Sequence, residues 1–262
     1  MAICLNRYMF EKRKLKNALA YYVHHQEVLG KIFYALDKSG IDWAIVGGFV
    51  RYILENGNRS LDNGPRDFDI IIDCSLEYFS NLIDSLGVNY TQNDFGGIKI
   101  KGVPGDTFAG KEIDIWMLES HEPFKIFESE YAPFPSYGFR TPFMNFKNIP
   151  DSAWISIDGA TWVVNKNKLY AKNAKKSIKS NSIFITNYDL LKKYKNKNNF
   201  ILAAKLIKYY YLGYTLDKDC WDIIKAEMTK NPDKVEEFLN SHYKYYMSWR
   251  NFIDEKIIRK IS

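Results

Sequence analysis

Residues 64–72 read Gly-Pro-Arg-Asp-Phe-Asp-Ile-Ile-Ile, and this stretch decides the fold because it places two carboxylates at the start of an apolar run. Side chains alternate along an extended strand, so Asp67 and Asp69 project from the same face. Two like charges in one space are costly unless a cation lies between them. Mg²⁺ is held by one or two carboxylates together with substrate phosphates. The pair therefore predicts a divalent metal site at the beginning of a buried strand.

A paired glycine precedes this strand. Residues 42–46 read as a buried strand, Gly47 and Gly48 follow, and residues 49–55 read as a helix. Glycine lets the backbone approach a ligand closely, and a helix N-terminus presents unpaired N–H groups to an anion. Arg51 in the first helical turn adds a positive charge. We interpret the segment as a cradle for a triphosphate, with a tight strand-to-helix turn as the alternative for two glycines alone.

A third carboxylate lies in the alternating segment 111–118. Asp114 falls between Ile113 and Ile115 and is predicted to point away from both. An acidic residue within an apolar strand needs a partner or a metal, although an edge-strand or N-cap position is an alternative. Three carboxylates suit two-metal phosphoryl or nucleotidyl transfer. In that chemistry we expect Asp114 to be the ligand nearest the attacking hydroxyl and to act as its base.

Together, residues 46–51 (Val-Gly-Gly-Phe-Val-Arg), 66–69 and 113–115 resemble the catalytic head of the polymerase-β nucleotidyltransferase superfamily. The nearest branch is the head and neck of class II CCA-adding enzymes and bacterial poly(A) polymerases. The resemblance implies an α+β fold in which helices flank a mixed, roughly five-stranded sheet, followed by a small C-terminal helical domain. We expect the nucleotidyltransferase head to cover residues 1–185 and the neck-like helical domain to cover residues 186–262.

The resemblance also implies an activity. Its members use Mg²⁺ (or Mn²⁺) to move a nucleoside monophosphate from an NTP, here ATP or CTP, to a hydroxyl acceptor with release of pyrophosphate. The expected acceptor is an RNA 3′ end, most closely a tRNA. The residues carried over are the catalytic metal ligands Asp67, Asp69 and Asp114 and the nucleotide contacts Gly47, Gly48, Arg51 and Arg66.

The chain departs from this pattern at several positions. Tyr52 stands where the family carries an acid after the arginine, and residues 152–160 keep the hydrophobic pattern of the family's next motif without its charges. The helix expected from residue 200 carries Lys205 and Lys208 in place of arginines. We find no counterpart of the Glu-Asp-x-x-Arg element that selects CTP and ATP. General transfer chemistry is therefore predicted better than ordered CCA synthesis.

Positive charge is concentrated between residues 166 and 197, which hold ten lysines and one acid, within a chain of formal net charge +6. Lysines with interleaved tyrosines suit a phosphate backbone and stacked bases, whereas a solvated surface is the alternative. The predicted RNA contacts are Lys175, Lys176, Lys192, Lys193, Lys205 and Lys208.

Two other functions stay open. The acceptor is alternatively a protein or small-molecule hydroxyl, as in toxin, defence or antibiotic-type transferases. A non-catalytic nucleotide- or RNA-binding relative is the third hypothesis, because Tyr52 stands where the family carries an acidic residue.

No apolar run approaches the ~20 residues that span a bilayer, and the N-terminus has no signal pattern, so we expect a cytoplasmic protein with no membrane contact. The oligomeric state stays open.

Local patterns predict further elements. An apolar face at helical spacing predicts one helix over residues 10–39, and another is predicted over 76–86. Residues 98–101 read as a strand, and residues 162–170 read as a hairpin with its turn at Asn-Lys-Asn-Lys.

Overall fold

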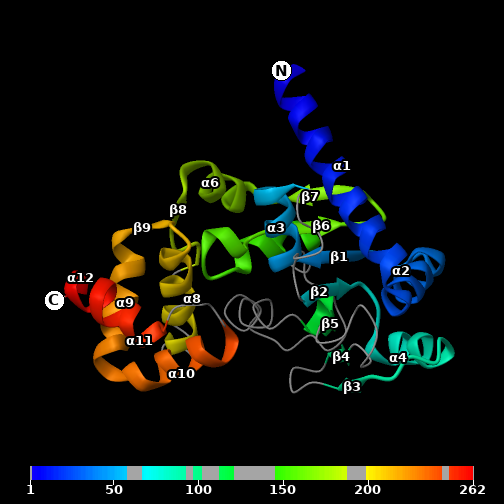
Figure 1. Ribbon diagram of the computed structural model, residues 1–262. Coiled ribbons are helices and arrows are strands. Elements are labelled where there is room, and N and C mark those ends of the chain that lie inside the picture. Colours follow the sequence, from blue (N-terminus) through cyan, green and yellow to red (C-terminus); the bar gives the residue numbers. More distant parts are fainter. Residues whose placement is uncertain are drawn as a thin grey trace, which may run out of the picture. The chain divides into compact units, whose positions relative to one another are not determined.

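The computed structural model describes residues 2–57, 67–92, 97–101, 112–120, 145–187, 199–243 and 248–261, with side chains from residue 9 onward (Figure 1). The chain forms two compact units. The first consists of Met1–Ser152 and Asp158–Ala174, and the second of Ala153–Ile157 and Lys175–Ser262.

The described part of the first unit contains a sheet flanked by α-helices. Its helices are α1 (Ala2–His25), α2 (Glu27–Ser39), α3 (Gly48–Asn56) and α4 (Leu76–Ser85), with the 3₁₀ turns η2 (Leu118–Ser120) and η3 (Phe146–Ser152). Its strands are β1 (Trp43–Val46), β2 (Asp67–Ile72), β3 (Thr91–Gln92), β4 (Ile98–Lys101), β5 (Glu112–Met117), β6 (Thr161–Val163) and β7 (Lys168–Tyr170). The helix over 76–86, the strand over 98–101 and the hairpin over 162–170 agree with their predictions.

The seven strands form one mixed sheet in the order β3-β4-β5-β2-β1-β6-β7. Strands β2 and β5 are parallel, and every other pair is antiparallel. The predicted α+β architecture with a mixed sheet is confirmed, but the sheet has more strands than expected. The β6–β7 hairpin extends it by pairing with β1, and the short strand β3 extends it beyond β4.

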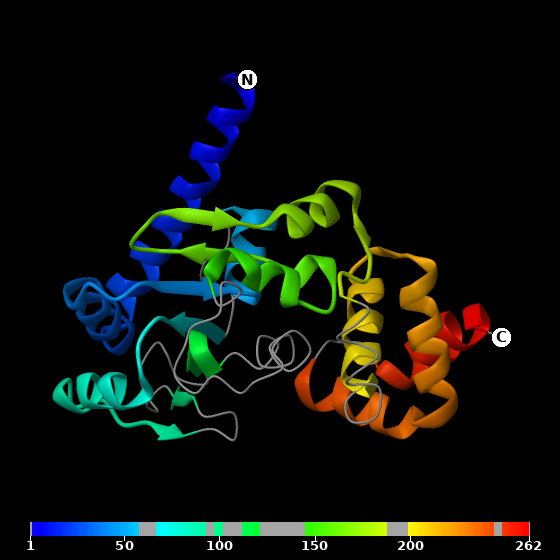
Figure 2. The same ribbon diagram turned by 180° about the vertical axis from the view of Figure 1, so that it is seen from behind.

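The two faces of the sheet differ in what covers them. One face, which we call the helix face, packs Trp43, Ile45 and Phe68 against α1, α2, α3 and α4 (Figures 1 and 2). The opposite face, the site face, carries Ala44, Val46, Ile71 and Val163, which form a smaller cluster with Phe146 and Ile149 of η3. The two sets of side chains lie on opposite faces because side chains alternate along each strand.

The single helix predicted over 10–39 is wrong, because the chain breaks between α1 and α2. Gln26 has an extended conformation at φ −140° and ψ 99° and is buried. A straight helix of thirty residues would be about 45 Å long. Two helices joined at a bend instead bring Leu15, Tyr22 and Ile32 into the same core.

The second unit is helical. Its elements are η4 (Ser156–Asp158, whose last residue belongs to the first unit), α6 (Lys172–Ser180, shared at its start), β8 (Ser182–Ile183), α8 (Asn199–Tyr211), β9 (Thr215–Leu216), α9 (Lys218–Lys230), α10 (Pro232–His242), α11 (Trp249–Phe252), the π-helix η5 (Ile253–Ile258) and α12 (Arg259–Ile261). Asp217 caps α9 by accepting a hydrogen bond from the backbone N–H of Cys220 at 2.9 Å.

The boundary between the units precedes the predicted one at residues 185 and 186. Ser156 and Ser177 are buried and their hydroxyls lie 2.6 Å apart. Ile183 and Ile185 belong to the core formed by α8, α9 and α10. The segment from Lys175 therefore packs within the helical unit, which local sequence patterns do not reveal. No helix in the described part of the chain is long and apolar enough to cross a lipid bilayer.

Candidate functional site

The two aspartates of β2 project from the site face. Phe68 and Ile70 are buried in the core of the helix face, and Asp67 and Asp69 alternate with them. Asp67 is exposed and Asp69 is half-buried. The alternation expected from the sequence is thus present, and both carboxylates face the same space.

Strand β5 brings two more carboxylates beside them. In the parallel register of β2 and β5, Asp67 is opposite Glu112 and Asp69 is opposite Asp114. Residues that are opposite each other in a sheet share a face, and neighbouring strands lie about 4.8 Å apart. We call Asp67, Asp69, Glu112 and Asp114 the carboxylate block. Asp114 therefore lies beside Asp69, as the sequence pattern predicted, whereas Glu112 was not predicted to take part.

The glycine turn lies against this block. Val46, the last residue of β1, is opposite Asp69, and Gly47 follows with φ 61° and ψ −124°. The backbone N–H of Gly47 donates to the carbonyl of Ala160 at 3.0 Å. A Cβ atom on Gly47 would lie 3.3 Å from Oδ2 of Asp69. The bend thus leaves room that any other residue would fill, directly beside a carboxylate and at the start of α3.

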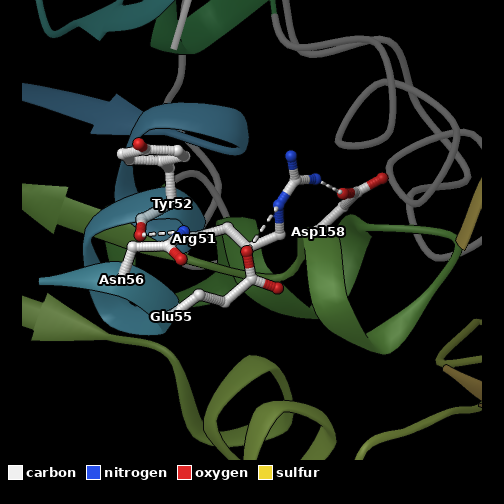
Figure 3. A network of polar contacts seen from close by, with 5 residues as sticks. All are labelled: Arg51, Tyr52, Glu55, Asn56 and Asp158. Atoms are coloured by element: carbon white, nitrogen blue, oxygen red, sulfur yellow. Dashed lines mark hydrogen bonds and ion pairs between the residues drawn. The ribbon is translucent and has the colours of Figure 1, made fainter. Parts of the chain in front are cut away.

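Arg51 lies one turn into α3 and is held by two carboxylates (Figure 3). Its Nη1 lies 3.0 Å from Oδ1 of Asp158, and its Nε lies 3.8 Å from Oε2 of Glu55. Tyr52 packs at the edge of the helix-face core, and its side chain points away from Arg51 and Asp158 (Figure 3). The guanidinium is half-buried and keeps a defined position. Sequence patterns did not predict Asp158 as its partner, because the two residues are 107 positions apart.

Lys99 on β4 is a cation that the sequence reasoning missed. It is opposite Asp114 in the antiparallel register of β4 and β5. Its Nζ lies 2.9 Å from Oε2 of Glu112 and 3.5 Å from Oδ2 of Asp114. The hydrogen bond to Glu112 raises the pKa of Lys99, as do the charges of Asp114 and Glu112, while burial acts in the opposite direction. The alternating segment Ile98–Lys101 was the available signal, but only the register places Lys99 beside Asp114.

The donor set suits a hard divalent cation. All four side chains of the carboxylate block offer oxygen ligands, which Mg²⁺ and Mn²⁺ prefer. No group of three acidic, histidine or cysteine side chains within the described residues is close enough together to hold a metal ion. Carboxylates repel one another without a cation between them, and Lys99 lies against Glu112 and Asp114. The residues fit such an ion in chemistry, in face and in register.

The predicted RNA contacts have different surroundings. Lys176 is exposed on α6, and Lys175 and Lys205 are half-buried. Lys208 is only 8% exposed, and its Nζ lies 4.0 Å from the ring centre of Tyr209 and 4.7 Å from that of Tyr243. This burial argues against a phosphate contact by Lys208, which stays an untested prediction. Arg66, Lys192 and Lys193 lie outside the described residues.

The sequence matches no family model, and no curated protein is similar to it. Solved structures are similar in fold. A CCA-adding enzyme in complex with CTP has a TM-score of 0.59 at 15% identity, over 94% of this chain and 55% of that one. The Thermotoga maritima CCA-adding enzyme complexed with tRNA has a TM-score of 0.59 at 13% identity, over 94% and 54%.

A tRNA-processing enzyme in an apo form has a TM-score of 0.56 at 13% identity, over 88% of this chain and 59% of that one. The chain therefore has the fold of one half of the CCA-adding enzymes, the head and neck, and spans little more than half the length of these proteins.

Proposed function

We propose that this chain, whose fold is that of the CCA-adding nucleotidyltransferases, moves a nucleoside monophosphate from an NTP to a hydroxyl acceptor. The observation that carries the proposal is the register of β2 and β5, which aligns Asp69 with Asp114 beside the glycine turn. Carboxylates on one face next to a backbone that leaves room for phosphates are the parts that this chemistry needs.

In the proposed reaction Asp67, Asp69 and Asp114 would hold Mg²⁺. A bound Mg²⁺ would supply positive charge to the triphosphate and would lower the pKa of the attacking hydroxyl. The acceptor oxygen forms a bond to the α-phosphorus, and the bond from that phosphorus to the bridging oxygen breaks, so that pyrophosphate leaves. We assign the proton of the hydroxyl to Asp114, which lies opposite Asp69 on the neighbouring strand.

The phosphates are proposed to lie at the glycine turn. Gly47 and Gly48 form the beginning of α3, whose first N–H groups favour an anion. Arg51 adds a charged donor that Asp158 already holds at 3.0 Å. Arg66 stays a predicted nucleotide contact on sequence grounds. Each of these roles places a positive or partly positive group where the triphosphate carries its charge.

For the acceptor we propose an RNA 3′ end of the tRNA type. Two observations support this choice: similar structures include a CCA-adding enzyme complexed with tRNA, and α6 carries Lys175 and Lys176 on the helical unit. Clustered lysines provide the sequence-independent part of RNA affinity.

The experiment that tests the proposal incubates the chain with each α-labelled NTP, Mg²⁺ and total RNA. Label in tRNA is the expected result, and the same reaction without Mg²⁺ is the control. Label found only in protein or small molecules would overturn the RNA acceptor and leave the transfer chemistry standing. Bound NTP without transfer of label to any acceptor would overturn the enzyme activity and favour a nucleotide-binding protein.

A further inference from the structure

Two lysines on β4 lie on the same face of the sheet as the carboxylate block. Lys99 is opposite Asp114, and Lys101 is opposite Glu112. The two ammonium groups differ in what they contact. Lys99 lies within 3.5 Å of both Glu112 and Asp114, whereas Lys101 is 69% exposed and lies 3.9 Å from Glu112. Of these two described lysines, Lys99 is therefore the one that contacts the third carboxylate of the site.

We propose that Lys99 is a positioning residue that competes with the divalent cation for Asp114 and thereby sets the affinity of the site for metal. The inference rests on the proposed function in one respect, since it takes Asp114 as a metal ligand. An ammonium and a metal ion that share a carboxylate oxygen repel each other. Metal binding therefore requires Lys99 to withdraw from Asp114.

Glu112 gives Lys99 a place to withdraw to. The contact from Lys99 to Glu112, at 2.9 Å, is shorter than the contact to Asp114, at 3.5 Å. Lys99 can thus leave Asp114 and keep its hydrogen bond to Glu112, so that its charge stays paired in both states. Without metal, Lys99 balances Asp114 and reduces the repulsion between Asp114 and Asp69. With metal, the cation takes over that role.

Partial burial of Lys99 and Asp114 strengthens the competition between the ammonium group and the metal ion. The side chain of Lys99 is only 29% exposed and that of Asp114 only 26% exposed, and partial burial weakens the screening of charges by water and salt. Removal of the ammonium should therefore strengthen metal binding. Coulomb's law gives about tenfold for one unit charge about 6 Å from a divalent ion in a water-like dielectric.

The test measures Mn²⁺ binding to the full chain at low ionic strength, from the electron paramagnetic resonance signal of free Mn²⁺, with Mg²⁺ as competitor. We expect Lys99→Met to bind Mn²⁺ about tenfold more tightly than the wild type. Lys99→Arg keeps the charge and should bind like the wild type. Lys101→Met removes a charge from the same strand but at the exposed position, and should change the affinity less than Lys99→Met does.

The outcomes separate this inference from the proposed function. If the wild type binds Mn²⁺ and Lys99→Met binds it equally or more weakly, the role of Lys99 is refuted while the metal site stands. If neither protein binds Mn²⁺, the metal site itself fails and the inference fails with it. Lys99→Gln gives a second neutral variant with a polar end, in case Lys99→Met does not fold, and circular dichroism checks the fold of each variant.

Discussion

Gly47 and Asp69 lie so close together that a side chain on the glycine would touch the carboxylate: a Cβ atom there would be 3.3 Å from Oδ2. The contact joins the two motifs recognised in the sequence, because the glycine turn ends β1 and Asp69 lies on the adjacent strand β2. The same glycine has a positive φ of 61°. Two independent physical reasons therefore require glycine at this position.

Gly47→Ala should destabilise the first unit by about 1–3 kcal/mol, the usual cost of a strained backbone conformation, and should reduce transfer activity by displacing Asp69. The measurement is the free energy of unfolding in urea together with the labelling assay. Gly48→Ala is the matched control. Among the described residues nothing lies within 4 Å of its Cβ position, and it begins a helix, so the free energy of unfolding should stay equal or rise by about 0.4–1 kcal/mol. Equal free energies of unfolding for the two variants would contradict the conclusion that Gly47 has a strained backbone that only glycine tolerates.

Asp69→Asn and Asp114→Asn should each abolish NTP-dependent transfer while the protein stays folded. Removing one of several neighbouring like charges relieves repulsion, and Lys99 keeps its shorter contact to Glu112 when Asp114 is changed. Activity should fall by roughly a hundredfold or more, since even the partners of metal ligands are worth about 10–100-fold. Asp84→Asn, a change at an exposed position of α4, is the control. An active Asp69→Asn protein would refute the metal assignment.

Arg51→Ala should weaken NTP binding by about tenfold or more, as expected for the loss of a hydrogen bond to a charged phosphate group. Asp158→Asn should have a smaller effect in the same direction, because Arg51 stays but loses the charge that holds it at 3.0 Å. Glu55→Gln changes the longer 3.8 Å contact and should have the smallest effect. Equilibrium binding of a non-hydrolysable NTP measures all three. An unchanged affinity of Arg51→Ala would remove Arg51 from the phosphate site.

The double change Lys175→Glu and Lys176→Glu should weaken RNA binding and lower its dependence on salt. Each phosphate contact that is lost reduces the slope of log affinity against log salt by about 1. Filter binding of labelled tRNA across a salt series measures that slope. Lys225→Glu, at an exposed position of α9, makes the same kind of charge change outside α6 and should leave most of the affinity. Equal loss in both proteins would show that net charge alone matters.

Lys208→Ala should destabilise the protein and leave the salt dependence of RNA binding unchanged. The ammonium of Lys208 lies over the rings of Tyr209 and Tyr243, and a cation–π contact contributes about 0.5–2 kcal/mol. Urea unfolding and the same tRNA binding series are the measurements. A lower salt slope with normal stability would mean that Lys208 contacts phosphate and that its burial has been misinterpreted.

Much of the site could be predicted because its decisive features are local. The spacing of Asp67 and Asp69 determines that they share a face of any strand, and the glycine pair before a helical segment identifies the turn. Glu112, Lys99 and Asp158 could not be found this way. Their roles depend on which strand lies beside β2, on the register of β4 and β5, and on a contact across 107 residues.

By itself, then, the sequence determined the alternation of each strand, the glycine turn and the oxygen-rich character of the site, because these depend on neighbours along the chain. The tertiary structure alone decided the parallel pairing that aligns Asp69 with Asp114, the lysine beside them, the break at Gln26 and the burial of Lys208. These features arise from packing between segments distant in sequence. Side-chain patterns limit such packing to a few arrangements but do not choose one among them.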